Sequence, residues 1–349
     1  MHRFDYSEIL GDIPQDITRM MMDISRMRSM EGIRRKEYRK DYERIVDIAK
    51  LASVKYSNEI EGIVTTDERI REIVLHGGTP ANHSEVEISG YKDVLNEIHL
   101  AHEKIRFDRD TVLRIHRTLH TKGSDIDGFK REDNAIVGVD GNGRRTLVFE
   151  PVPADETEDH MEQLFLAYSE LSTQGYEPLL YIPCIILDFL CIHPFADGNG
   201  RTSRLLTELL LYKEGYDICR YVSMDEHIAY TRDNYYSSLG QSSQGWRENR
   251  WTYFPFTRYF LRMLVECYMD LDTRFMIIDG KGLNRTQSVE EILKKSIAPM
   301  SKRQICVALG GVSPNTIEKS LKQLMKEGRI ERIGETKAAR YVIRQSDSR

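Results

Sequence analysis

The stretch HPFADGNGRTSR, residues 193–204, decides how the middle of this 349-residue chain is organised. It follows the apolar run YIPCIILDFLCI, residues 181–192, and leads into RTSRLLTELLLYKEG, residues 201–215. Both flanks predict helices, so residues 197–200 lie in a helix–loop–helix joint, where the second helix begins. Free N–H groups and the positive end of the helix dipole make such a joint an expected anion site.

Several side chains of the joint suit a phosphate. Gly198 and Gly200 have no side chain to keep phosphate oxygens away from the backbone. Arg201 and Arg204 are three positions apart, so both can face one side of the second helix. The guanidinium of arginine offers phosphate oxygens a planar pair of donors. The joint is therefore predicted to bind a phosphorylated ligand.

Two further residues of the joint point to a reaction. Asp197 offers a hard oxygen ligand to Mg²⁺, which nucleotide phosphates normally carry. His193 titrates near neutral pH and could take a proton from an attacking hydroxyl. Each feature alone is more often structural. Together they place a base, a metal ligand, an anion loop and two arginines within twelve residues, which favours an active site.

The tetrapeptide GNGR also occurs at residues 141–144, inside DNAIVGVDGNGRRTLVFEPVP. There it separates two short β-branched or aromatic runs, which predicts a β-hairpin. The glycines of this copy then provide backbone geometry in a turn.

Residues 193–204 resemble the signature of the Fic domain, H-P-F-x-[DE]-G-N-G-R-x-x-R, at every fixed position. The resemblance covers roughly residues 86–275, and the hairpin corresponds to the family's target-docking flap. It implies a mainly α fold with an all-helical core. Most Fic enzymes transfer AMP from ATP, with Mg²⁺, to a Ser, Thr or Tyr hydroxyl of a target protein.

The resemblance also implies residue roles. His193 would deprotonate the target hydroxyl, Asp197 would hold Mg²⁺ on the α- and β-phosphates, and Arg204 would position the γ-phosphate. Tyr236 would line the adenine pocket, although a place in a helix core is nearly as reasonable. The other phosphate-binding residues would be Gly198, Asn199, Gly200 and Arg201. The flap would hold the target through Ile136, Val137 and Gly138, for each of which plain hairpin packing stays open.

The segment SNEIEG, residues 57–62, resembles the family's inhibitory motif, [ST]-x-x-x-E-[GN]. It ends a predicted amphipathic helix that precedes the core, and Ser57 and Glu61 lie on one face of that helix. In relatives with this arrangement the glutamate pairs with the second signature arginine, here Arg204, which leaves ATP misplaced. Relatives with this glutamate can also remove AMP, an activity that stays open here. An exposed acid at a helix end is the alternative.

Charge is distributed unevenly along the chain. Residues 294–349 carry thirteen Lys or Arg against five Asp or Glu, a surplus of +8, whereas the whole chain has a net charge of −5. Together with the patterns above, this asymmetry predicts three regions. They are an N-terminal helical region with the inhibitory helix at 1–85, a Fic core at 86–278 and a winged-helix domain at 288–345.

The basic C-terminal region predicts a winged helix-turn-helix, with Ser313 capping a helix that has Pro314 at its first position. That helix carries Asn315, Lys319, Lys322 and Lys326, which would suit a DNA groove. Winged helices also bind proteins or mediate dimerisation, so a DNA partner, a protein partner and a homodimer all stay open.

No apolar run is long enough to span a membrane and no secretory signal is visible, so no membrane partner is expected. The five cysteines form no C-x-x-C pair, and reduced thiols predict a cytoplasmic location. The chain is thus predicted to be an autoinhibited protein adenylyltransferase. The competing hypothesis is a DNA-binding regulator that senses a nucleotide without transferring it, and a Fic enzyme with another donor is a third.

Overall fold

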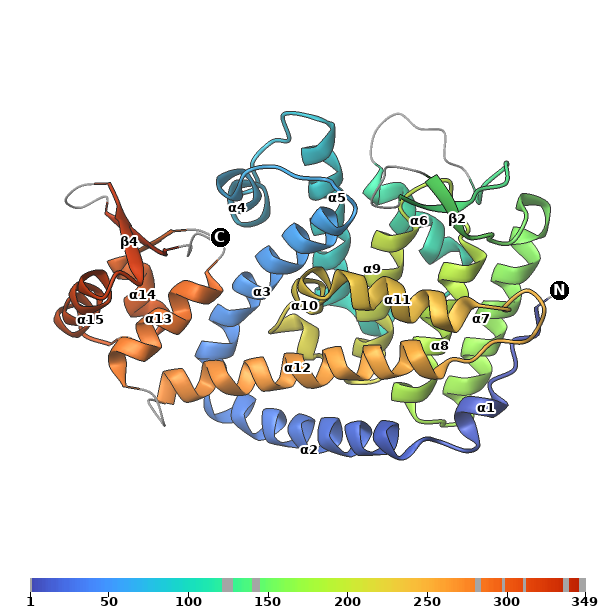
Figure 1. Ribbon diagram of the computed structural model, residues 1–349, viewed down its shortest axis with the longest axis horizontal. Helices are drawn as coiled ribbons and strands as arrows, with labels where there is room; N and C mark the ends of the chain where they lie inside the picture. Colours follow the sequence, from blue (N-terminus) through green and yellow to red (C-terminus); the bar gives the residue numbers. More distant parts are fainter. Residues whose placement is uncertain are drawn as a thin grey trace.

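The computed structural model describes residues 2–120, 128–139, 145–279, 284–296, 299–309, 312–334 and 339–344. It consists mainly of α-helices with two small antiparallel sheets, as the sequence predicted (Figure 1). The helices are α1 (Ser7–Leu10), α2 (Gln15–Glu37), α3 (Arg39–Ile60), α4 (Asp67–His76), α5 (His83–Ala101), α6 (Arg109–Leu119), α7 (Thr157–Thr173), α8 (Pro178–Ile192), α9 (Asn199–Lys213), α10 (Met224–Tyr230), α11 (Arg232–Ser243), α12 (Phe254–Asp279), α13 (Arg285–Lys295), α14 (Lys302–Ala308) and α15 (Pro314–Lys326). The strands are β1 (Ile136–Val139), β2 (Arg145–Phe149), β3 (Met300–Ser301), β4 (Ile330–Ile333) and β5 (Arg340–Ile343).

The central helix is α8, which is apolar on every side and therefore buried. It packs against α7, α9 and α12. The N-terminal helices belong to the same core, because Ile17 and Ile24 of α2 and Val54 of α3 join the apolar cluster that contains α8 and α9. In Figure 1, α2 runs alongside α12 at the base of the molecule. Residues 7–60 thus form one packed body with the central region.

The carboxylate of Asp188, on α8, anchors the N-terminal segment. It is fully buried and accepts hydrogen bonds from the Tyr6 hydroxyl at 2.8 Å, the Trp246 indole at 2.8 Å and the Tyr253 hydroxyl at 3.0 Å. Burial raises the pKa of Asp188 to about 7, and the three hydrogen bonds oppose this shift. The charged carboxylate therefore depends on its three donors.

We expect Tyr6→Phe to destabilise the protein at pH 8, where Asp188 is charged, because the change removes one of these donors and little volume. A hydrogen bond to a charged group contributes about 1.5–3 kcal/mol, and the free energy of unfolding should fall by that amount. Urea unfolding measures the change. Tyr176→Phe is the control, because Tyr176 is exposed. Equal stability of the two variants would contradict the anchoring role.

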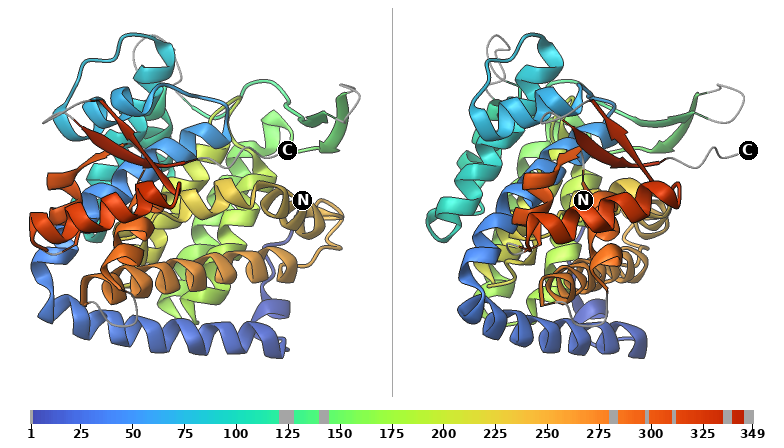
Figure 2. Two further views of the ribbon diagram at one scale, coloured as in Figure 1. Left: turned by 60° about the vertical axis from the view of Figure 1, so that its left-hand side comes forward. Right: turned by 90° about the vertical axis from the view of Figure 1, so that its left-hand side faces the viewer.

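Strands β1 and β2 form the predicted hairpin. They pair antiparallel with Val137 opposite Leu147 and Gly138 opposite Thr146, and the register shifts between Ile136 and Val137. The hairpin projects from the helical body (Figure 2). The turn with the first GNGR, residues 141–144, lies outside the described residues.

Residues beyond α12 form a separate cluster of elements. Helices α13, α14 and α15 pack on a three-stranded sheet of order β3-β5-β4. They enclose their own apolar core, which includes Val289, Ile317 and Leu321 and is distinct from the main one. Ser313 caps α15 as expected, whereas the pairing of β3 with β5 was not predicted. The winged-helix assignment of this unit stays a prediction.

The described helices include none with the length and hydropathy needed to cross a membrane. All five cysteines have free thiols, and only Cys306 is partly exposed.

Candidate active site

His193 occupies an unusual backbone position at the end of α8. Its φ of 52° and ψ of 59° lie in the left-handed region, where its N–H still donates to the Phe189 carbonyl at 3.0 Å. A non-glycine residue in this conformation costs roughly 1–2 kcal/mol. Such strain persists where the surrounding structure enforces it, commonly at functional sites.

The imidazole of His193 is prepared to accept a proton. Its Nδ1 lies 3.2 Å from the Leu190 carbonyl oxygen, which can only accept, so Nδ1 carries the hydrogen and Nε2 keeps its lone pair. Burial lowers the pKa of His193 to about 4, so the ring is neutral at physiological pH. The geometry therefore provides a neutral base.

Polar and aromatic contacts hold the loop after His193 in shape. Asn199 bonds the Phe195 backbone twice, accepting from its N–H at 3.0 Å and donating to its carbonyl at 2.7 Å. The Phe195 ring stacks on His116 at a centroid distance of 3.6 Å, and His116 Nε2 donates to the Asp197 carbonyl at 2.9 Å. The Asn199 side chain thus shapes the loop, which leaves its backbone N–H as the group that can meet a phosphate.

Other side chains lie close to both glycines of the second GNGR. Gly198 has φ 78°, and a Cβ there would overlap Nε2 of His120. A Cβ at Gly200 would overlap Oε1 of Glu61. The Glu61 carboxylate therefore lies against the first turn of α9, whose N–H groups have no intrahelical acceptors. A carboxylate thus lies beside the helix N-terminus that was predicted to bind an anion.

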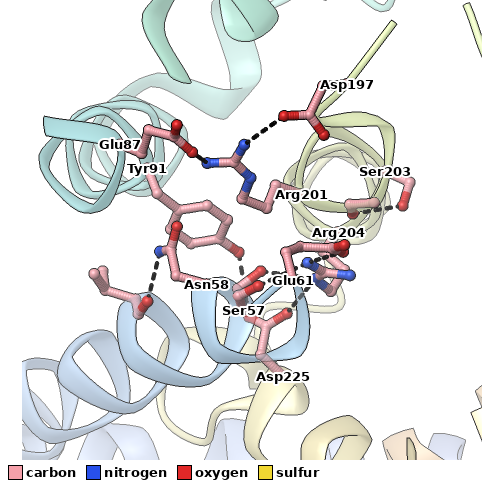
Figure 3. A network of polar contacts seen from close by, with 12 residues as sticks. Ser57, Asn58, Glu61, Glu87, Tyr91, Asp197, Arg201, Ser203, Arg204 and Asp225 are labelled. Carbon is pink, nitrogen blue, oxygen red and sulfur yellow. Dashed lines mark hydrogen bonds and ion pairs between the residues drawn. The ribbon is translucent and has the colours of Figure 1, made fainter. Parts of the chain in front are cut away.

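Arg204 meets the end of α3 through three contacts (Figure 3). Its Nε donates to Ser57 Oγ at 2.7 Å, and its Nη2 donates to the Ser57 carbonyl at 2.7 Å and to Glu61 Oε1 at 2.9 Å. Asp225 approaches Nε at 3.4 Å. The Arg204 side chain is only 4% exposed, against 32% for Glu61. Arg204 thus contacts Glu61, the partner predicted for it, and also Ser57, for which no contact with Arg204 was predicted.

Arg201 and Asp197 form a second polar group. Nη1 of the buried Arg201 bonds Glu87 at 2.5 Å, and its Nη2 lies 4.0 Å from the Asp197 carboxylate. Asp197 itself is 83% exposed. The described residues contain no cluster of three or more His, Cys, Asp or Glu side chains suited to a metal. A lone exposed carboxylate fits Mg²⁺ that is bound mainly through nucleotide phosphates and water.

The remaining predicted residues lie around this centre. Tyr236, on α11, is 44% exposed and packs edge-on against Tyr235. A small cavity beside Arg204 is lined from α11 by Tyr235. On the hairpin, Val137 is exposed while Ile136 and Gly138 are half-buried. Strand β1 pairs only with β2 among the described residues, which leaves its other edge open.

Residues 106–211 match the model of the Fic/DOC family. A Fido domain-containing protein of Dictyostelium discoideum is 30% identical over 114 residues, which cover 32% of this chain and 74% of that protein. The chain belongs to the Fic/DOC family.

Two adenylyltransferases of this family match a larger part of the chain. The protein adenylyltransferase Fic of Nematostella vectensis is 25% identical over 262 residues, covering 71% of this chain and 54% of the relative. Protein adenylyltransferase fic-1 of Caenorhabditis briggsae is 26% identical, covering 54% and 33%. The chain thus spans about half or less of these adenylyltransferases. A Fic family protein from Desulfovibrio desulfuricans G20 has the same fold, with a TM-score of 0.61 at 18% identity, covering 97% and 99%.

Sequence reasoning missed several residues of this Fic site. Glu87 and Asp225 contact the two signature arginines, and Lys130 and Asn134 contact the end of α8 and the loop after it. Their distance from the signature along the chain hides them, because no spacing rule links them to it. Only Asn134 carried a hint, since it directly precedes the predicted hairpin.

Proposed function

We propose that this Fic protein is a protein adenylyltransferase, which moves AMP from ATP to a hydroxyl side chain of a target protein. The observation that carries the proposal is a neutral His193, with Nε2 free, at the start of the loop that leads to the N-terminus of α9 and Arg204. A base beside an anion site suits attack of a hydroxyl on a phosphate. The names of the adenylyltransferase relatives agree with this chemistry.

In the proposed reaction, Nε2 of His193 accepts the proton of the target hydroxyl. The hydroxyl oxygen bonds to the α-phosphorus, the bond from that phosphorus to the bridging oxygen breaks, and pyrophosphate leaves. The first N–H groups of α9, Arg201 and Arg204 bind the phosphates. Mg²⁺, held by Asp197 and the phosphates, would offset the negative charge of the leaving group. Positioning and charge stabilisation thus provide most of the catalysis.

The flap would present the target. Because β1 has an open edge in the described hairpin, an extended target segment can pair with Ile136, Val137 and Gly138 as an added strand. Main-chain pairing binds many sequences, so the flap sets the position of the hydroxyl rather than the identity of the target.

We also propose that Glu61 inhibits this reaction. Its carboxylate holds Arg204 and lies against the first turn of α9, so the γ-phosphate of ATP would meet a negative charge and an occupied arginine. Removal of AMP from modified targets, with Glu61 directing a water, stays open for this site.

Transfer can be tested with ATP labelled at either the α- or the γ-phosphate, using the Glu61→Gly variant, Mg²⁺ and a cell lysate. We expect protein to become labelled from the α-phosphate only. Label from the γ-phosphate would indicate a kinase. No label from either, with ATP binding shown by calorimetry, would favour the nucleotide-sensing regulator.

The low pKa of His193 predicts a wide pH range for transfer. A base must be unprotonated, and a pKa of about 4 keeps it so from neutral pH down to pH 5. We therefore expect kcat of Glu61→Gly to stay nearly level between pH 8 and pH 6, and to decline only as pH approaches 4. A half-maximal kcat near pH 6.5, the ordinary histidine value, would contradict the buried, neutral base.

A second function, DNA binding, is favoured by one face of α15. Asn315, Lys319, Lys322 and Lys326 are all exposed, and they lie opposite the buried Ile317, Leu321 and Leu324. Lys319 and Lys326 form no ion pair with any described carboxylate. Lysines on one helix face bind phosphates without reading bases. We therefore propose that the C-terminal unit binds duplex DNA with little sequence preference.

We expect Lys319→Glu/Lys326→Glu to weaken binding of a fluorescent DNA duplex at least tenfold, and to reduce the slope of log affinity against log salt by about 2. The control is Lys36→Glu/Lys104→Glu, which makes the same charge change at exposed sites on the main body. Equal weakening in both variants would show that only the net charge of the protein matters. If the unchanged protein does not bind DNA at all, a protein partner becomes the better explanation for this face.

A further inference from the structure

Four consecutive carbonyl groups, from the last residue of α8 and the three residues that follow it, are bound by the segment that leads into the hairpin. Lys130 donates through Nζ to the Ile192 carbonyl at 3.2 Å and through its backbone N–H to the Pro194 carbonyl at 2.8 Å. Nδ2 of Asn134 donates to the carbonyls of His193 at 3.2 Å and of Phe195 at 2.9 Å. Every carbonyl from 192 to 195 therefore has a partner in this segment.

The two side chains also bind each other. Nζ of Lys130 donates to Oδ1 of Asn134 at 2.7 Å, so both residues form one unit, called here the clamp. Carbonyls at the end of a helix lack intrahelical donors, and a cation there also complements the helix dipole. Lys130 is buried, and burial lowers its pKa to about 8, which leaves it mainly charged at pH 7. Burying an ammonium is costly unless its bonds compensate.

The clamp is joined firmly to the hairpin. Asn134 lies two residues before β1, and Asp133 Oδ1 accepts the Ala154 N–H at 2.7 Å, which ties the start of the hairpin to the segment that follows β2. The ring of Phe129, next to Lys130, packs on Phe195 of the loop at a centroid distance of 5.7 Å. The flap and the His193 loop thus share one set of short contacts.

We infer that Lys130 and Asn134 are positioning residues that fix His193 relative to strand β1. A target segment paired with β1 would then present its hydroxyl at Nε2 of His193, although neither clamp residue touches a reactant. The inference rests on the proposed function. It also explains how His193 is kept in its left-handed conformation, because the carbonyls on both sides of it are held.

The clamp acts on the base and not on the phosphates, so its loss should lower kcat and leave the KM for ATP unchanged. Displacement of a reacting group by about 1 Å can cost on the order of a hundredfold in rate. In the Glu61→Gly background, we expect Asn134→Asp to reduce kcat tenfold to a hundredfold. This variant keeps the Lys130 contact and the volume but loses both carbonyl donors.

Two substitutions of Lys130 test whether a loss of activity comes from the missing clamp contacts or from misfolding. Lys130→Met should reduce kcat similarly, and Lys130→Arg should recover part of it, because a guanidinium also binds the carbonyls. Glu132→Gln, at an exposed neighbouring site, is the control. A kcat within twofold of the parent in Asn134→Asp, or a raised KM for ATP with unchanged kcat, would overturn the inference.

A readout that needs no activity distinguishes this inference from the proposed function. The Nδ1–H of His193 is held by the Leu190 carbonyl, and its NMR signal can be followed in protein labelled with ¹⁵N-histidine. We expect its NMR signal to shift and exchange faster with water in Asn134→Asp, while the Nδ1–H signal of His102, which is held by the Ile98 carbonyl, changes little. Unchanged His193 signals in both Asn134→Asp and Lys130→Met would refute the positioning role, whether or not any variant transfers AMP. Shifted His193 signals in proteins that transfer no AMP would support the positioning role and reject only the proposed transferase function.

Discussion

Glu61→Gly should raise the rate of AMP transfer about five- to 150-fold above that of the unchanged protein. This range corresponds to a coupling of 1–3 kcal/mol, which is typical between two mutually exclusive contacts. The variant removes the carboxylate that holds Arg204 and lies against Gly200, so both become accessible to ATP phosphates. Initial rates of protein labelling from α-labelled ATP measure the change.

The matched control for this variant is Glu59→Gly. Glu59 lies in the last turn of α3, is exposed and makes no described contact with Arg204. A glycine there should weaken α3 at least as much as one at Glu61, because Glu59 lies inside the helix and Glu61 follows it. Activation by Glu59→Gly to the same extent would mean that loosening of α3, rather than the Glu61 carboxylate, controls the site. Equal transfer rates in the unchanged protein, Glu61→Gly and Glu59→Gly would contradict inhibition by Glu61. The proposal that the protein is an adenylyltransferase would still stand.

His193→Ala, made in the Glu61→Gly background, should lower kcat by about 10²–10⁴, the usual contribution of a general base. The imidazole is the group with a free Nε2 and contributes nothing to the arginine contacts, so ATP affinity should change less than twofold. Single-turnover labelling gives the rate, and calorimetry with a non-hydrolysable ATP analogue gives the affinity.

The control for the base is His76→Ala, because His76 is an exposed histidine at the end of α4. A loss below tenfold in His193→Ala would show that the target hydroxyl does not need this base. A parallel loss of ATP affinity would indicate that the substitution disturbs the loop and not only the chemistry.

Local patterns predicted much of this architecture. The apolar run before His193, the glycine joint and the hairpin each follow from short-range rules, and all three are present. The contact of Glu61 with Arg204 was also predicted, but only through the family resemblance, and the bonds of Ser57 to the same arginine were not. No periodicity could have placed α3 against α9.

What local patterns could not predict are the roles of residues whose partners come from elsewhere in the chain. Asn199 has the identity expected of a phosphate ligand, yet its amide is used by the Phe195 backbone. Arg201 was predicted to bind phosphate, but its ion pair with Glu87 of α5 could not be foreseen. The Lys130–Asn134 clamp was invisible for the same reason. Tertiary contacts, which short sequence windows do not record, decide these cases.

The burial of α3 has a consequence for the speed of any switching at Glu61. Val54, Ser57, Asn58 and Ile60 are all buried, and α3 packs on α5 and α10, so swinging the helix away would expose core side chains. Glu61, in contrast, follows the helix and is partly in solvent. Rotation of this one side chain breaks its contact with Arg204, whose bonds to Ser57 remain. Such rotations take roughly picoseconds to nanoseconds when exposed, against microseconds or longer for collective motions. Under the proposed inhibition, the Glu61–Arg204 contact should therefore open and close many times during one turnover, and ATP should compete with Glu61 at equilibrium rather than wait for it to leave.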